Sequence, residues 1–132
     1  FRRFHPGGSL GHRLSLVRDL MHTGDSVPLV PLNAPMMDVL AEMTRKGFGC
    51  VGVMDGKKLV GIITDGDLRR HMGPNILEST ACDLMTRNPV CVGADALSAK
   101  AQGVMEERKI TCVFVVDDEH SPLGVLSMHD IL

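Results

Sequence analysis

The stretch GIITDGDL occupies residues 61–68, and a related stretch, GVLSMHDI, occupies residues 124–131. In both, a glycine and two apolar residues precede a hydroxyl residue, and an aspartate stands three positions after that hydroxyl. The shift between the two stretches is 124 − 61 = 63 residues. One copy of so short a pattern is weak evidence, but a second copy in the same chain indicates an internal repeat.

The repeat extends beyond these two stretches. Asp19-Leu20-Met21 is echoed by Asp83-Leu84-Met85 at a shift of 83 − 19 = 64. Cys50-Val51 is echoed by Cys112-Val113 at a shift of 112 − 50 = 62. The similar shifts indicate two copies of one structural unit.

We therefore expect two modules, at residues 17–80 and 81–132, preceded by a linker at residues 1–16. A module with one small sheet cannot cover both faces of that sheet alone. The two copies should consequently pack together about a pseudo-twofold axis, with matched clefts between them.

Each module is predicted to begin with a short extended run, at residues 27–30 and 90–92, followed by a helix. Asn33 and Asp95 are the expected N-caps of the two helices, and Gly47 suits the C-terminal end of the first. In the first helix, apolar residues recur at helical spacing at Met36, Val39, Leu40 and Met43. The second helix follows the same spacing at Leu97, Ala101, Val104, Met105 and Arg108.

Two β-rich runs complete each module. Residues 50–54 and 59–63 flank Asp55-Gly56, a step that favours a tight hairpin, and residues 112–116 and 123–127 repeat the arrangement with a looser turn. A short helix should follow each hairpin, and the second is expected to be truncated at Leu132. The order strand, helix, strand, strand, helix predicts an α+β fold.

Composition excludes several classes of function. Lys and Arg number 14 against 16 Asp and Glu, and aromatic residues make up 3% of the chain, so neither duplex nor single-stranded nucleic acid is an expected partner. Signal-peptide and membrane-spanning patterns are absent from the sequence, as are metal-ligand spacings. The four cysteines form no CxxC pair, which favours a reduced, soluble, cytoplasmic protein.

The repeated motif has a chemical interpretation. A strand that ends at Thr64 or Ser127 delivers a hydroxyl and free backbone N–H groups to a helix start, where a phosphate is favoured. Asp67 or Asp130 can then accept hydrogen bonds from a ribose diol. The alternative is that both hydroxyls cap their helices, with each aspartate supporting the first turn. One residue can serve both purposes.

The two motif copies resemble the closing motif of cystathionine β-synthase-type (CBS) modules. This resemblance implies a pair of pseudo-twofold-related modules, each β-α-β-β-α, with nucleotide clefts built from both. One cleft would group Ser127, His129 and Asp130 with the strand entry at Phe48 and Gly49. The reciprocal cleft would group Thr64 and Asp67 with Ile110 and Thr111.

The two expected clefts differ in their charged residues. His129 stands at the motif position of Gly66 and could supply a donor or a cation to a phosphate, although it could also be a surface histidine. Arg69 and Arg70 follow the first motif and could serve the other cleft, or they could be solvated helix charges.

Three further stretches narrow the resemblance. HPGGSLG at residues 5–11, followed by VRDLMH at residues 17–22, resembles the junction between a sugar isomerase domain and the CBS pair in bacterial arabinose 5-phosphate isomerases. TDGDLRR at residues 64–70 is also typical of that family. In that family a sugar isomerase (SIS) domain precedes the CBS pair and interconverts ribulose 5-phosphate and arabinose 5-phosphate, which supplies Kdo for lipopolysaccharide or capsule synthesis. By this resemblance His5 matches a histidine that acts in the isomerase site, in proton transfer.

The resemblance implies a regulatory module that is not catalytic by itself, because the substrate site would lie in the upstream SIS domain. The expected ligands are a nucleotide sugar, CMP-Kdo, as a feedback signal, or an adenine nucleotide. The alternative is a structural module with empty clefts that supports a homo-oligomer, for which the apolar residues Met36, Met37 and Met72 are candidates.

Overall fold

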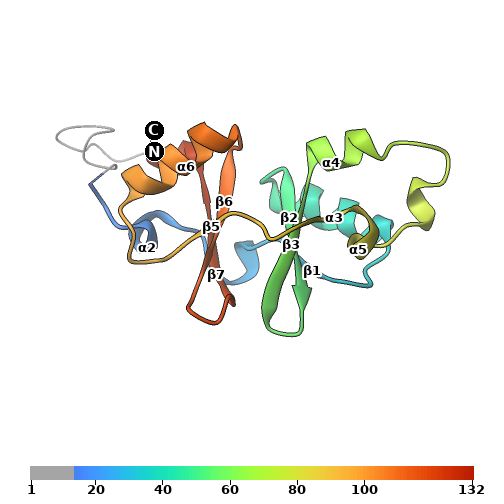
Figure 1. Cartoon of the computed structure of the whole chain (residues 1–132), viewed down its shortest axis with the longest axis horizontal. Helices are drawn as coiled ribbons and strands as arrows, with labels where there is room; N and C mark the ends of the chain where they lie inside the picture. Colours follow the sequence, from blue (N-terminus) through green and yellow to red (C-terminus); the bar gives the residue numbers. More distant parts are fainter. Residues whose placement is uncertain (1–13) are drawn as a thin grey trace.

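The computed structural model describes residues 14–132, and within them the chain forms two small sheets that face each other at the centre of the molecule (Figure 1). The first sheet has the order β1-β2-β3-β4, and its strands are Leu29–Pro31, Cys50–Asp55, Lys58–Thr64 and Thr86–Arg87. The second sheet has the order β5-β6-β7, and its strands are Cys91–Val92, Cys112–Val116 and Pro122–Ser127.

Helices cover the outer sides of the two sheets (Figure 1). They are α2 (Val17–Leu20), α3 (Met36–Lys46), α4 (Asp65–Arg70), α5 (Ala81–Leu84), α6 (Ser98–Arg108) and α7 (Met128–Ile131). Two 3-10 turns, η1 (Gly24–Ser26) and η2 (Ile76–Glu78), lie in the connections. The predicted α+β fold of two related modules is confirmed.

The register of the strands reproduces the repeat. β1 runs parallel to β2 with Leu29 opposite Gly52, and β5 runs parallel to β6 with Cys91 opposite Phe114. Both equivalent pairs are related by a shift of 62 residues (91 − 29 and 114 − 52). Both hairpins also carry a β-bulge at the corresponding place, after Val53 in the first and after Val115 in the second.

The predicted helix caps are wrong at both N-termini. Helix α3 begins at Met36 with Pro35 in the N-cap position, so Asn33 lies too early in the chain to bond to the first turn. Helix α6 begins at Ser98, and the carboxylate of Asp95 instead forms an ion pair with Arg18. The C-terminal prediction holds, because Gly47 follows α3 with a φ of 78°, a left-handed conformation that glycine adopts without strain.

The apolar face predicted for α3 is buried, with Met36, Val39 and Met43 in the first core. The prediction for α6 is correct only in part. Ala101 and Met105 are buried, but Leu97 and Arg108 are exposed, and the small or polar residues Ser98 and Gln102 are buried in their place.

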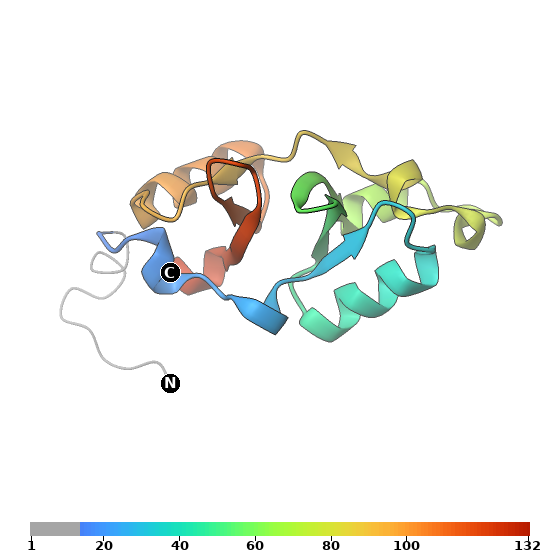
Figure 2. The same ribbon diagram turned by 90° about the horizontal axis from the view of Figure 1, so that it is seen from below.

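The first helix of each sequence repeat packs on the sheet of the other repeat (Figure 2). Val17 of α2 belongs to the core beneath α6, whereas Ala81 and Leu84 of α5 belong to the core beneath α3. The segment after each of these helices also pairs with the other repeat. After α5, β4 of the second repeat pairs with β3 of the first. After α2, His22 of the first repeat forms an antiparallel bridge with Val125 of the second. The two halves are therefore interlocked.

A third cluster of buried residues draws on strands of both sheets, and Phe114 is one of its members. The Phe114 ring is fully buried, and it packs over Gly52, where an added Cβ would lie 3.0 Å from the ring. Burial of such a side chain stabilises the fold by about 1.5–3 kcal/mol.

Within residues 14–132, the helices are too short or too polar to cross a membrane.

Candidate ligand-binding clefts

The first motif forms a closed capping box at the start of α4. The carboxylate of Asp67 accepts hydrogen bonds from the Thr64 backbone N–H at 2.9 Å and from the Thr64 hydroxyl at 3.1 Å. The Asp67 N–H donates back to the same hydroxyl at 3.3 Å. The Thr64 hydroxyl is thus engaged both as donor and as acceptor, which supports its capping role.

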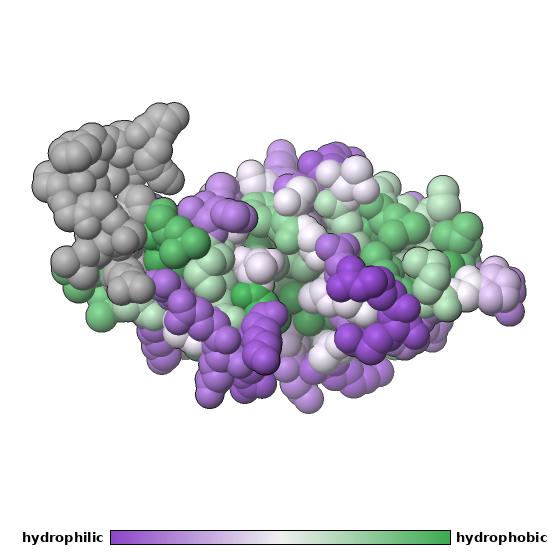
Figure 3. Space-filling view, turned by 90° about the horizontal axis from the view of Figure 1, so that it is seen from above, coloured by the Kyte–Doolittle hydropathy of each residue, from purple (hydrophilic) through white to green (hydrophobic). Residues whose placement is uncertain are grey.

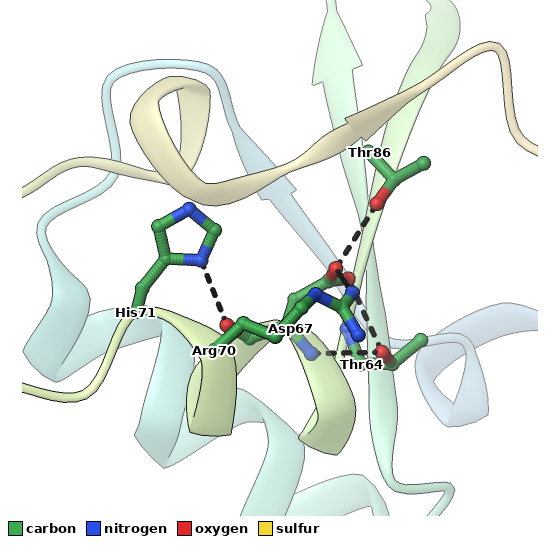
Figure 4. Close-up of polar contacts among 5 residues, drawn as sticks. All are labelled: Thr64, Asp67, Arg70, His71 and Thr86. Carbon is green, nitrogen blue, oxygen red and sulfur yellow. Dashed lines mark hydrogen bonds and ion pairs between the residues drawn. The ribbon is translucent and has the colours of Figure 1, made fainter.

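The second carboxylate oxygen of Asp67 is also occupied (Figure 4). Oδ1 accepts from the Thr86 hydroxyl at 3.0 Å and forms an ion pair with Arg70. The ring of His71 lies 2.9 Å from the backbone oxygen of Asp67. Because the Asp67 side chain is 4% exposed and fully bonded, a ligand hydroxyl would have to displace an existing partner.

The second motif has the same box but a more open carboxylate. Ser127 caps α7 by accepting from the His129 N–H at 3.1 Å, and Oδ2 of Asp130 accepts from the Ser127 N–H at 2.8 Å. Oδ1 of Asp130 lies 2.9 Å from Nε2 of His22. The Asp130 side chain is 20% exposed, which leaves it more accessible to a ligand than Asp67.

His22 brings the two sides of one predicted cleft together. Its ring packs edge to face against Phe48, with ring centroids 5.2 Å apart, while its Nε2 bonds Asp130. Phe48 and Asp130 were predicted to share a cleft, and the structure connects them through this imidazole. The sequence analysis did not identify His22 as a site residue.

A cleft of about 500 Å³ opens beside this contact, lined by His22, Asp25, Ser26, Arg45, Lys46 and Phe48. The two basic residues at its edge are already paired, because both contact Glu42 and Lys46 also donates to the backbone oxygen of Asp25. An anionic ligand would therefore compete with Glu42 for these cations. Neither Arg45 nor Lys46 was a predicted site residue.

Glu42 is held ionised by these neighbours. Burial raises the pKa of its carboxyl group, but the hydrogen bond from Arg45 and the charge of Lys46 outweigh burial and leave the pKa below its ordinary value of 4.5. The cleft edge thus carries a compact group of one carboxylate and two cations.

The remaining predicted residues lie at the strand entries or on the surface. Gly49 has a φ of 74°, and a Cβ there would lie 3.3 Å from a carboxylate oxygen of Asp65, so the entry is tightly packed. Of the residues predicted for the reciprocal cleft, Thr111 accepts from the Met128 N–H at 2.8 Å through its backbone oxygen, and Ile110 packs against the second core. Neither residue lines the cleft of about 500 Å³.

The basic residues predicted for phosphate contact are solvent-exposed. Arg69 and the side chain of His129 lie at exposed positions. Arg70, rather than Arg69, is the arginine that contacts the motif aspartate. His5, predicted for catalysis in the parent enzyme, lies outside the described residues.

A second, smaller hollow of about 290 Å³ lies in the connection between α4 and α5. It is lined by His71, Gly73, Pro74, Asn75, Ile76, Ser79, Asp83 and Leu84. None of the predicted ligand-binding residues lines it.

The chain consists of two equivalent, interlocked modules, and in each the motif aspartate belongs to the capping box of the last helix. These features define the protein as a tandem pair of related modules. A family model described as "CBS domain" matches residues 17–73 and 81–132, and the chain belongs to this family. The resemblance read from the repeated motif is confirmed.

The chain is also similar to longer proteins. It is 46% identical over 132 residues to the arabinose 5-phosphate isomerase KdsD of Pseudomonas aeruginosa, a match that covers 97% of this chain and 40% of that protein. It is 44% identical over 136 residues to KdsD of Escherichia coli K12, with 100% of this chain and 41% of that protein covered. The chain thus spans well under half the length of these isomerases.

Among solved structures, the chain is similar to the CBS domain pair of protein MJ0100, determined in complex with 5′-methylthioadenosine and S-adenosyl-L-methionine. The TM-score is 0.79 at 26% sequence identity, with 89% of this chain and 93% of the other covered.

Proposed function

We propose that this chain is the regulatory, ligand-binding part of an arabinose 5-phosphate isomerase, and that the cleft beside His22 and Phe48 binds a nucleotide or a nucleotide sugar. The observation that carries this proposal is the asymmetry between the two motif aspartates. Within the described residues, the Asp130 side chain is 20% exposed and its two oxygens contact one group each, His22 and the Ser127 N–H. The Asp67 side chain is 4% exposed, and each of its oxygens contacts two groups.

The cleft offers complementary groups for a nucleotide. Asp130 does not line the cleft itself but contacts its lining residue His22 through Oδ1. This oxygen can accept a ribose hydroxyl beside or in place of His22, because a carboxylate oxygen accepts more than one hydrogen bond. The half-buried ring of Phe48 provides an apolar wall for a base. Lys46 and Arg45 at the cleft edge can turn from Glu42 toward a phosphate or sugar carboxylate.

Two ligand classes have separate support. The adenosyl compounds bound to the CBS pair of MJ0100 favour an adenine nucleotide. The similarity to KdsD favours CMP-Kdo, since control by the activated sugar would be end-product feedback. A thermal-shift panel of AMP, ATP, CMP and CMP-Kdo distinguishes them, because a ligand present at 100 times its Kd stabilises the folded state by about 2.7 kcal/mol. A panel in which no compound raises the Tm would contradict the proposal.

A structural role is the second candidate, supported by exposed apolar residues. Met37 is 63% exposed, Met72 68% and Leu77 53%, and Figure 3 shows apolar surface toward both ends of the face that it draws. Met36, which was grouped with them from the sequence, is fully buried in the first core and cannot contribute. Sedimentation of the wild type and of Met72→Lys tests whether this surface forms a homo-oligomer.

The catalytic activity is proposed for the parent enzyme and not for this chain. The proposal includes an upstream SIS domain, a role of His5 in proton transfer there, a linker at residues 1–16, a supply of Kdo for lipopolysaccharide and a cytoplasmic location. The purified 132-residue chain should not isomerise ribulose 5-phosphate above a control without protein. Measurable turnover would contradict the assignment of catalysis to the parent.

A further inference from the structure

Two cysteines at equivalent positions of the repeat meet between the two sheets. Cys50 is the first residue of β2, and Cys112 is the first residue of β6. Their sulfur atoms are 2.8 Å apart, closer than two sulfurs in van der Waals contact. The two residues are 1% and 6% exposed and belong to the cluster that draws on strands of both sheets.

The cysteine pair adjoins both copies of the closing motif. In the strand register, Cys50 lies opposite Thr64 and Cys112 lies opposite Ser127, the two residues that cap the motif helices. Cys112 also contacts the backbone oxygen of Phe48, with 3.8 Å between sulfur and oxygen. A covalent bond between these sulfurs would therefore join the starts of β2 and β6 directly.

We propose that Cys50 and Cys112 form a reversible disulfide between the two modules on exposure to a hydroperoxide such as hydrogen peroxide. A disulfide bond is about 2.05 Å long, so the sulfurs need to approach each other by only about 0.8 Å. Because both thiols are buried, the oxidant has to be small.

The environment assigns different roles to the two sulfurs. The hydrogen bond with Cys112, followed by burial, raises the pKa of Cys50. The hydrogen bond from Cys50 lowers the pKa of Cys112. Cys112 is also the more exposed of the two, at 6% against 1%, so a small oxidant reaches it first. We therefore assign the attack on the oxidant to Cys112, because the thiolate is the nucleophile.

The reaction balances with one molecule of hydrogen peroxide. The Cys112 sulfur attacks a peroxide oxygen, the O–O bond breaks, and the departing hydroxide takes up a proton to give water and a sulfenic acid on Cys112. The Cys50 sulfur then attacks the Cys112 sulfur, its proton leaves with the hydroxyl group, and a second water is released. Two thiols are oxidised to one disulfide, and the peroxide is reduced to two waters. A dithiol reductant reverses the reaction by thiol–disulfide exchange.

Within residues 14–132, the other two cysteines contact other groups and not a second thiol. Burial raises the pKa of the Cys91 thiol to about 11, which keeps it protonated, and its sulfur contacts the backbone oxygen of Pro89. Cys82 contacts the guanidinium group of Arg87 on the surface. Any effect of the cross-link on ligand affinity rests on the proposed function, but the formation of the cross-link does not.

The test counts free thiols in the whole chain. The protein is treated with hydrogen peroxide, unfolded and alkylated with N-ethylmaleimide, and its intact mass is then measured by mass spectrometry. We expect the four adducts of the reduced chain to fall to two, and dithiothreitol to restore four. Without reduction, trypsin should yield peptides 47–57 and 110–132 joined together.

Two variants separate the outcomes. The double variant Cys82→Ala/Cys91→Ala should still lose both of its thiols, whereas Cys50→Ala should form no intramolecular disulfide. Retention of all four thiols by the wild type, a disulfide that contains Cys82 or Cys91, or a sulfinic acid on Cys112 as the main product would overturn the proposal. The peptide map of the wild type gives this answer even if Cys50→Ala fails to fold.

Discussion

Nε2 of His22 lies 2.9 Å from Oδ1 of Asp130, although 108 residues separate them along the chain. The exchange of the first helices explains this contact, because α2 brings His22 onto β7 beside the second motif. Thr86 holds the equivalent place in the other half, with its hydroxyl 3.0 Å from Oδ1 of Asp67. The two motif aspartates thus share one arrangement but differ in the group that faces them.

Replacement of Asp130 should weaken ligand binding. Asp130→Ala removes the accessible acceptor, and the loss of a hydrogen-bond partner at roughly 1–3 kcal/mol corresponds to a decrease in affinity on the order of tenfold or more. Calorimetric titration with the best compound of the thermal-shift panel measures this change. Asp118→Ala, at an exposed position in the β6–β7 turn, is the control that should bind as the wild type does. Unchanged affinity in Asp130→Ala would exclude the ribose role of this carboxylate.

Replacement of Asp67 should instead destabilise the fold. Asp67→Ala leaves the Thr64 N–H, the Thr86 hydroxyl and Arg70 without their common acceptor in a buried site. We expect the free energy of unfolding to fall by about 2–3 kcal/mol, more than for Asp130→Ala, whose carboxylate is more exposed. Urea denaturation of both variants compares them. Equal losses of stability would show that the extra contacts of Asp67 contribute nothing.

The sequence predicted the elements whose signals are local. The Asp55-Gly56 step marks the first hairpin, the helical spacing of Met36, Val39 and Met43 marks the buried face of α3, and the repeated motif indicates that Asp67 and Asp130 are equivalent. These features follow from backbone turns and side-chain periodicity within one module, which neighbouring residues determine.

The features that the sequence analysis missed depend on contacts between modules. Helices α2 and α5 each have four residues, too few for a periodic pattern. No local signal therefore showed that each of them packs on the sheet of the other repeat. A signal for His22 did exist: the Asp-Leu-Met echo immediately precedes both His22 and Thr86 and marks them as equivalent. Polar residues Asn33 and Asp95 were plausible caps by residue type, but the extended backbone at Pro35 and Leu97 delays both helices.

Stability should decrease in acid partly through Glu42. Its pKa is lowered in the folded state, so its contribution is fully present above the ordinary value of 4.5 and is lost as the pH falls through the lower folded value. Unfolding in urea at pH 6 and near pH 3.5 should therefore show a smaller pH-dependent loss in Glu42→Gln than in the wild type. Arg45→Gln removes the main partner that lowers this pKa and should also reduce the loss. An identical pH dependence in all three proteins would contradict this role.

The two motif glycines should respond differently to alanine, although they occupy equivalent positions. A Cβ at Gly124 would lie 2.6 Å from the backbone oxygen of His22, whereas a Cβ at Gly61 would lie 2.5 Å from the Met85 sulfur. A methionine side chain can move aside, but the His22 backbone is fixed by its bridge to Val125. We therefore expect Gly124→Ala to cost about 1–3 kcal/mol and to displace His22 from Asp130, with a smaller cost for Gly61→Ala. Gly103→Ala, in open space on α6, is the control, and it should preserve or raise stability by up to about 1 kcal/mol. Thermal unfolding of the three variants gives the order, and a larger loss for Gly61→Ala than for Gly124→Ala would show that the backbone at His22 yields more readily than the Met85 side chain.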